Sequence, residues 1–327
     1  MAATKRVVRN QEADRVTLYE AFEGFIMEKE ARNRSAATLE NYRVSYDLFL
    51  KFFEYDEHEV YVDEIVVTHF YKWVNTMKLN GVKPSTINHY LRDTRAFFYW
   101  CMAKDREYIK PAFKILLLDS GEEKLKLFSD EDIDKLLVKP RVKDSFSEWR
   151  SWAIINWVLG TGNRAATICE VKMEDVNFAQ REITIKNVKG KKIQTTPLSP
   201  ALETVLKEYI RMWRSNADKD AWLFCNVGEE KFNPDALRLA FVRYSKGREV
   251  NQANIHGLRH NFAKGWVKNN GNMFALQKLL GHSSLDMTRK YVRLFADDIK
   301  DDFEKFSPLD SIKRNAKRTQ TVKRNDN

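Results

Sequence analysis

Six residues in the second half of the chain carry the side chains that cleavage of a phosphodiester by transesterification requires. Guanidinium groups match the geometry of phosphate oxygens and neutralise their charge. A tyrosine hydroxyl can attack phosphorus when a neighbouring group takes its proton, and lysine or histidine can act as acid or base. The residues that could meet these needs are Arg164, Lys189, His256, Arg259, His282 and Tyr291. They predict a site that holds one phosphate while a tyrosine attacks it.

Alternatives stay open for single members of this set. His282 follows Gly281 and could merely cap a helix, and Tyr291 could be a core aromatic residue. Lys189 has three nearby substitutes, which are Lys186, Lys191 and Lys192. The order of all six residues along the chain favours a shared site over these separate explanations.

A metal site is the main chemical alternative. His256 and His260 stand four residues apart, like zinc ligands on one helix face. Gly257, however, occupies the position where a metalloprotease motif has glutamate, and no third ligand is evident. No cluster of carboxylates is placed to hold Mg²⁺. We therefore expect neither a metal nor a cofactor.

Composition favours a polyanionic partner, with nucleic acid first. The net charge is +10 and the isoelectric point is about 9.3. The cysteines Cys101, Cys169 and Cys225 are scattered and odd in number, which is typical of thiols in a reducing compartment. No apolar run approaches the roughly 20 residues of a membrane helix. We expect a soluble, cytoplasmic, nucleoid-associated protein that does not contact a membrane.

Changes in pattern predict five segments. Residues 1–15 read as a flexible basic arm and residues 308–327 as a basic tail. Residues 16–104 contain four or five amphipathic helical patterns with little strand signal. Residues 105–125 hold proline, glycine and a charged run, which is typical of a linker. A second domain of residues 126–307 follows.

The second domain mixes helices with a few strands. Residues 149–159 read as a buried helix, and residues 182–188 and 192–197 read as two strands joined by a Lys-Gly-Lys turn. Helical patterns resume at residue 199 and continue to about residue 303. The predicted fold class is mainly α with a small antiparallel β-sheet near residues 176–198.

In these contexts the sequence resembles the tyrosine recombinase, or phage integrase, family. Residues 160–164 are similar to the segment around the family's first arginine, and residues 256–260 match its His-x-x-Arg motif. Residues 280–284 match its second histidine motif, and Tyr291 follows at the family's spacing. Residues 16–104 look like the core-binding, SAM-like helical domain, and residues 126–307 like the catalytic domain. The resemblance implies a two-domain clamp around duplex DNA.

The resemblance also implies a role for each candidate. Tyr291 would attack the scissile phosphate and form a 3′-phosphotyrosyl link, while Arg164 and Arg259 clamp the non-bridging oxygens. Lys189 would protonate the 5′-hydroxyl leaving group. His256 would exchange the tyrosine proton, and His282 would hydrogen-bond the phosphate. The expected function is site-specific recombination or integration of a mobile DNA element, with two protomers on each core site and four in the synapse.

The first domain offers candidate contacts to the DNA backbone. The N-terminus of the helix that begins near residue 84 presents free amides and a positive dipole end, which suit a phosphate. The alternative to a phosphate contact is a capped helix whose polar face is simply exposed to solvent. The candidate DNA-binding residues are Arg34, Lys83, Ser85, Thr86, Arg92 and Arg95.

Two departures from the family pattern keep other functions open. Thr167 stands where the family usually has an acid, and Asn163 where it usually has an aliphatic residue. A DNA-binding regulator of the phage-repressor type, with reduced or lost catalysis, is therefore the alternative function. A topoisomerase-like enzyme that nicks and reseals one duplex would need the same six residues.

Overall fold

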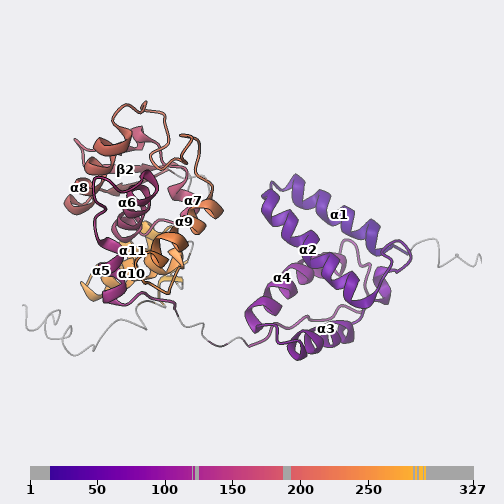
Figure 1. Ribbon diagram of the computed structural model, residues 1–327. Helices are drawn as coiled ribbons and strands as arrows, with labels where there is room; N and C mark the ends of the chain where they lie inside the picture. The colour runs from indigo at the N-terminus through magenta and orange to yellow at the C-terminus, as the bar shows by residue number, and fades with distance from the viewer. Residues whose placement is uncertain are drawn as a thin grey trace, which may run out of the picture. The chain divides into compact units, whose positions relative to one another are not determined.

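The chain forms two compact units, residues 1–123 and 124–327, each with its own apolar core (Figure 1). The computed structural model describes residues 15–119, 121, 125–186, 193–282, 284–285, 287–289 and 291. Within those residues, no helix is both long and apolar enough to cross a membrane.

The first unit is built from α1 (Leu18–Ala31), α2 (Ala36–Phe53), α3 (Val67–Leu79) and α4 (Pro84–Cys101). Local sequence explains where these helices begin. The Thr17 and Glu20 side chains form a reciprocal capping box at the start of α1, and Ser35 accepts a hydrogen bond from the Thr38 amide. Pro84 opens α4, where its missing N–H costs nothing.

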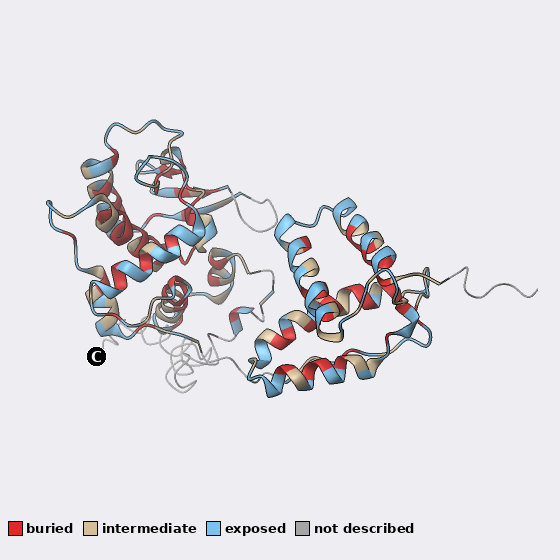
Figure 2. Cartoon of the chain, turned by 45° about the vertical axis from the view of Figure 1, so that its right-hand side comes forward, coloured by how far each residue is buried: buried red, intermediate tan, exposed pale blue. Residues whose placement is uncertain are grey.

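Aromatic side chains fill the core of the first unit. Phe22 stacks on Tyr46 with ring centroids 3.7 Å apart, and Phe97 meets both rings edge-on. Figure 2 shows the buried residues as stripes along single faces of these helices. After α4 the chain returns across this unit. Asn88, buried on α4, holds the returning segment through two hydrogen bonds between its side chain and the backbone of Leu118.

The second unit is centred on α6 (Phe146–Thr161). This helix is buried over most of its length and contacts α5, α8, α9 and α10. The helices of this unit are α5 (Asp130–Leu137), α6, α7 (Ala165–Ile168), α8 (Pro200–Tyr209), α9 (Pro234–Lys246), α10 (Ile255–Lys268) and α11 (Met273–Leu280).

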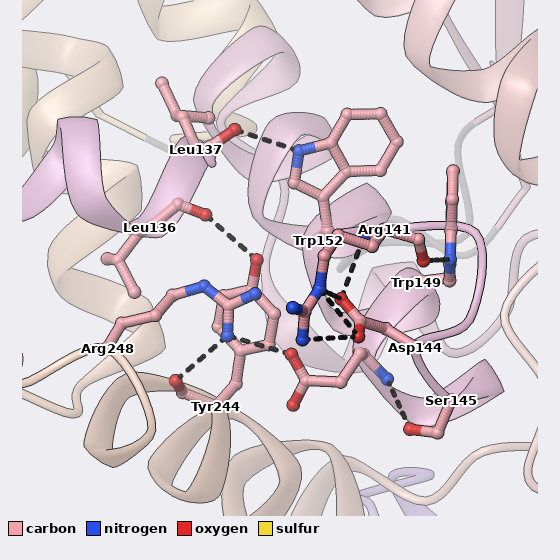
Figure 3. Close-up of polar contacts among 10 residues, drawn as sticks. Leu136, Leu137, Arg141, Asp144, Ser145, Trp149, Trp152, Tyr244 and Arg248 are labelled. Carbon is pink, nitrogen blue, oxygen red and sulfur yellow. Dashed lines mark hydrogen bonds and ion pairs between the residues drawn. The ribbon is translucent and has the colours of Figure 1, made fainter. Parts of the chain in front are cut away.

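Aromatic donors fix the C-terminal end of α5 to its neighbours (Figure 3). The Tyr244 hydroxyl donates to the Leu136 carbonyl over 3.1 Å, and the Trp152 indole N–H donates to the Leu137 carbonyl over 3.0 Å. The last carbonyls of a helix have no partner within the helix, so these bonds satisfy groups that would otherwise be buried and unpaired. They join α5 to α6 and α9.

A three-stranded antiparallel sheet completes the second unit. Its strands are β1 (Val176–Asn177), β2 (Glu182–Ile185) and β3 (Gln194–Pro197), in the order β1-β2-β3. Ile183 pairs with both Val176 and Thr196 and points into the core. The predicted fold class, mainly α with a small antiparallel sheet, is confirmed. The two longer strands are shorter than predicted, since Lys186 and Ile193 lie outside them.

Candidate active site

Arg259 is the centre of the site, and two helix ends hold it. Its Nη1 donates to the carbonyl of Gly162 at the end of α6 over 2.6 Å. Its Nη2 donates to the carbonyl of Leu280 at the end of α11 over 2.7 Å. Terminal carbonyls of helices carry partial negative charge and lack helical partners, so they stabilise a cation. These hydrogen bonds fix the guanidinium and compensate for its burial, since Arg259 is only 3% exposed.

Gly162 makes this arrangement possible. It ends α6 in the left-handed conformation, with φ of 67°, and a Cβ there would lie 2.5 Å from Cδ1 of Phe262. Only glycine has both the backbone freedom and the absence of a side chain that this position requires. The turn aims its carbonyl at Arg259 and starts the next short helix, α7, at Arg164.

Arg164 brings a second positive charge to the same place. It precedes α7 as its N-cap residue, and its Nη2 lies 3.5 Å from the Gly281 carbonyl oxygen. The two arginines thus contact the carbonyls of consecutive residues, Leu280 and Gly281. Neither arginine forms a salt bridge with an acid in the described part of the chain.

Electrostatics reflect this concentration of charge. Burial lowers the pKa of Arg259 to about 10, and the neighbouring charge of Arg164 acts in the same direction. Arg259 still carries its proton at neutral pH. Two closely spaced, partly desolvated cations favour an anion between them, and phosphate is the anion that paired guanidinium groups fit best.

His282 is bound to Arg259 and to Thr288. Arg259 Nη2 lies 3.0 Å from His282 Nε2, and His282 Nδ1 lies 2.8 Å from the Thr288 hydroxyl oxygen. Because a guanidinium can only donate, Nε2 must accept, and the ring proton of the neutral imidazole sits on Nδ1. Nδ1 therefore donates to Thr288, which is fully buried.

Tyr291 lies in the same cluster and is 1% exposed. Its ring packs in an apolar cluster, and it is parallel to the His282 ring with centroids 6.3 Å apart. Burial raises the pKa of the Tyr291 hydroxyl, while the charges of Arg259 and Arg164 oppose the rise. The apolar neighbours are Ala263, Val267, Leu276 and Leu280.

The hydroxyl of Tyr291 meets a residue that the sequence analysis did not place in the site. His260 Nδ1 lies 2.8 Å from the hydroxyl oxygen, and His260 is 7% exposed. In the sequence, His260 was weighed as a metal ligand and lay within the residues 256–260 that match the His-x-x-Arg motif. Its position directly after Arg259, on a helix that faces the tyrosine, is the signal that could have found it. Thr288 was missed as well, although it lies three residues before Tyr291.

His256 stands at the exposed start of α10, one turn before His260. The two imidazole rings meet edge-on with centroids 4.6 Å apart. Asn254 fixes this end of the helix, because its side chain accepts a hydrogen bond from the His256 amide.

The structure separates one of the alternative lysines from the site. Lys186 donates to Glu174 and forms a salt bridge with Asp175, both over 2.7 Å, and these acids raise its pKa. A lysine bound in this way is poorly suited to give up a proton. Lys189, Lys191 and Lys192 lie outside the described residues.

Of the two departures from the family pattern, Asn163 has a local structural explanation. Asn163 is buried, and its amide oxygen accepts the indole N–H of Trp157 over 3.0 Å. This bond anchors the turn before Arg164 to α6. Thr167 lies in α7 at intermediate exposure. Gln194 donates to the Leu279 carbonyl over 3.4 Å and so joins β3 to α11.

A metal-binding alternative finds no support at the two histidines of α10. A Cβ on Gly257 would lie 2.8 Å from the Lys126 carbonyl oxygen and 2.9 Å from the Phe128 ring, so no glutamate fits between the histidines. Across the described residues, no group of three His, Cys, Asp or Glu side chains is arranged to hold a metal ion.

The candidate DNA-binding residues lie on the surface of the first unit. Lys83 and Ser85 flank the first residue of α4, and Arg92 lies further along that helix; all three are exposed. Arg34 is exposed in the turn before α2. Thr86 and Arg95 are partly exposed, and the Arg95 guanidinium lies 5.7 Å from the centre of the Tyr99 ring.

Comparison with known proteins identifies the family of this chain. Residues 126–297 match the phage integrase family, and residues 23–105 match the family's N-terminal SAM-like domain. The chain belongs to the phage integrase family. The predicted resemblance is thereby confirmed. The alternative of a regulator is not favoured.

Two relatives of this chain are named tyrosine recombinases. The chain is 28% identical to XerA of Pyrococcus furiosus over 193 residues, which cover 57% of this chain and 64% of XerA. It is 25% identical to XerC of Thermodesulfovibrio yellowstonii over 282 residues, which cover 84% of this chain and 91% of XerC. The chain thus spans just under two thirds of the first relative and most of the second.

Solved structures share the fold of the integrase. The Tn1549 transposon integrase in complex with circular intermediate DNA has a TM-score of 0.65 and 20% identity, covering 84% of this chain and 95% of that one. A lambda integrase dimer bound to a core site has a TM-score of 0.64 and 15% identity, covering 83% of this chain and 97% of that one.

Proposed function

We propose that this integrase is a site-specific recombinase that cuts and rejoins duplex DNA through a 3′-phosphotyrosyl intermediate. One observation carries the proposal. The Arg164 and Arg259 side chains converge on the backbone of residues 280–281, beside a buried tyrosine. Within the described residues no acid forms a salt bridge with either arginine, so their charge is available to a phosphodiester.

The proposed chemistry is a transesterification without metal or external energy. The Tyr291 oxygen attacks phosphorus, and a phosphotyrosyl bond forms as the bond from phosphorus to the 5′ oxygen breaks. Arg164 and Arg259 bind the non-bridging oxygens, whose charge grows in the transition state. A preorganised donor in such a site typically contributes roughly 2.7–4 kcal/mol. The ester conserves the bond energy, so the reverse attack by a 5′ hydroxyl reseals the strand.

Three further residues have proposed roles. Lys189 protonates the 5′ oxygen as it leaves, a role for which Lys186 is less suited because Glu174 and Asp175 hold it. His256 takes part in exchange of the tyrosine proton. His282 donates to a phosphate oxygen once DNA replaces its present contact with Arg259 and its Nε2 carries a proton.

The first unit is proposed as the core-binding domain, within residues 16–104, joined by residues 105–125 to a catalytic domain of residues 126–307. Its exposed cations would contact phosphates, and the N-terminus of α4 would add free amides and a positive dipole end. The basic segments 1–15 and 308–327 would add non-specific affinity. The proposed DNA contacts are Arg34, Lys83, Ser85, Thr86, Arg92 and Arg95.

Assembly on DNA follows the pattern of the structural neighbours. Lambda integrase is described as a dimer bound to a core site and as a tetramer bound to a Holliday junction. We propose the same two assemblies for this chain: a dimer on each core site and a tetramer in the synapse. Its place of action would be the cytoplasm, on the nucleoid.

The decisive experiment traps the covalent intermediate on a suicide substrate, nicked beside the cleavage position so that the released fragment diffuses away. The wild-type protein should form a protein–DNA adduct, and Tyr291→Phe should form none while retaining DNA affinity. Tyr244→Phe is the matched control, because it also deletes one buried tyrosine hydroxyl, here bonded to Leu136. Binding of a verified site without any adduct would instead support a regulator.

A second assay separates recombination from simple nicking and resealing. Two duplexes that carry the site and different labels are mixed with the protein. A recombinase produces molecules that carry both labels, whereas a topoisomerase-like enzyme relaxes supercoiled DNA and leaves the labels unexchanged. Relaxation without exchange would contradict the proposal while keeping the proposed cleavage chemistry.

A further inference from the structure

The hydroxyl of the proposed nucleophile contacts a polar neighbour, His260. Its Nδ1 lies 2.8 Å from the Tyr291 hydroxyl oxygen, at ideal distance for a hydrogen bond, and the ring centroids are 5.7 Å apart. Both side chains are buried. The tyrosine ring belongs to the same buried apolar cluster as Ala263 and Leu276, so packing restrains its hydroxyl before any DNA binds.

The surroundings make this contact suitable for proton transfer. Little water reaches either group, and a hydrogen bond in such an environment is stronger than one in water. When the neutral ring of His260 carries its proton on Nε2, Nδ1 accepts from the hydroxyl. The centroid of the His256 ring lies 4.6 Å from that of the His260 ring, and His256 is exposed to solvent.

We infer that His260 is a catalytic residue, which takes the hydroxyl proton of Tyr291 as the tyrosine attacks, with His256 connecting it to solvent. The inference rests on the proposed function. As the bond from the Tyr291 oxygen to phosphorus forms, the hydroxyl proton moves to His260 Nδ1. The bond to the 5′ oxygen breaks, and that oxygen receives a separate proton from the general acid. In the resealing step His260 returns the proton to the tyrosine.

Several titratable groups lie around the pair formed by His260 and Tyr291. His256 and Arg259 lie on its own helix, and Tyr291 and His282 lie on the segment after α11. Arg164 contributes positive charge from the start of α7. A change in the pH profile alone would therefore not identify His260, and the test uses the acidity of the tyrosine itself.

The experiment measures the single-turnover rate of adduct formation by the full chain on the nicked substrate. Three proteins are compared: wild type, His260→Leu and His260→Asn. Asparagine keeps an acceptor oxygen near the position of Nδ1, and leucine removes it. We expect His260→Leu to slow cleavage by about 10²–10⁴-fold, the usual range for a lost general base. His260→Asn should lose less.

A second substitution separates proton transfer from mere support of the fold. A fluorinated tyrosine at position 291 has a more acidic hydroxyl and needs less help from a base. It should restore part of the rate lost in His260→Leu, yet change the wild-type rate little. If fluorination gives the same proportional change in both backgrounds, or if His260→Leu cleaves at the wild-type rate, the inference is wrong.

The outcomes also distinguish this inference from the proposed function. Absence of an adduct with wild-type protein overturns both. A wild-type adduct together with an unaffected His260→Leu overturns the inference alone. If His260→Leu does not fold, the rate of adduct formation by His260→Asn is measured with and without the fluorinated tyrosine. Fluorination should restore part of the lost rate only if His260 acts as the base.

Discussion

Arg259 donates a hydrogen bond to Nε2 of His282, with 3.0 Å between the two nitrogens. This contact sets the protonation of the histidine, since an arginine cannot accept and the imidazole must present a lone pair. The ring proton is then on Nδ1, where Thr288 receives it over 2.8 Å. DNA that separates Arg259 from His282 frees Nε2, and donation to phosphate then requires a proton at that nitrogen. Thr288 thus controls which form of His282 meets the DNA.

Replacement of Thr288 tests this control. Thr288→Val has nearly the same shape but leaves the buried Nδ1–H without its acceptor, which costs about 1–3 kcal/mol of stability. We expect adduct formation to fall by about tenfold, equivalent to about 1.4 kcal/mol in the barrier. Thr288→Ser keeps the hydroxyl and should retain most activity. Equal losses in both variants would point to packing instead.

Arg259→Lys tests whether a guanidinium, and not only a charge, is needed. One ammonium group cannot reproduce the two-pronged contact with the Gly162 and Leu280 carbonyls and also meet a phosphate. We predict a loss of at least about 10²-fold in the rate of adduct formation. Arg248→Lys is the control, because Arg248 is also largely buried and bonds Glu148 (Figure 3). That variant should cleave DNA nearly as wild type.

Two glycines with similar backbone conformation offer a matched pair. Gly162 and Gly81 have φ of 67° and 72°, but a Cβ at Gly162 would meet Phe262 at 2.5 Å, whereas Gly81 faces open space. Alanine at either position costs roughly 1–2 kcal/mol of backbone strain. Only Gly162→Ala adds overpacking, about 1–3 kcal/mol more, and displaces the carbonyl that holds Arg259. Thermal unfolding and adduct assays should both single out Gly162→Ala.

Salt dependence of DNA binding tests the proposed surface of the first unit. Each lost phosphate contact should reduce the slope of log affinity against log salt by about 1. We expect this for Lys83→Gln and Arg92→Gln, whose side chains are exposed. Arg141→Gln removes the same charge at a position where Asp144 already neutralises it. That control should leave the slope unchanged, and a uniform effect of all three variants would contradict the assigned surface.

Alkaline pH should destabilise the protein partly through Tyr291. Burial raises the pKa of its hydroxyl above the ordinary value of 10, so above that pH the unfolded chain loses a proton that the folded chain keeps. The stabilisation is complete below pH 10 and declines as pH rises towards the folded-state pKa. The difference in unfolding free energy between wild type and Tyr291→Phe should shrink over this window. A constant difference would show that Tyr291 ionises normally.

The sequence by itself predicted the chemistry and determined the class of fold. Six side-chain types in order predicted phosphate binding and tyrosine attack, because few other reactions need two arginines, a lysine, two histidines and a tyrosine together. Apolar spacing predicted the helices of both units, since the periods of helix and strand are written in local patterns. In the structure, the Thr17 and Ser35 side chains cap the helices that begin after them.

Only the tertiary structure decided which residues touch. Gly162, Leu280 and Gly281 enter the site through backbone carbonyls, which no residue type reveals. His260 gained its position because α10 turns that residue towards Tyr291, and 31 residues separate the two along the chain. Such contacts depend on how helices pack, which is set by the whole core at once. Local sequence fixes the periodicity of a helix but not the partner that its face will meet.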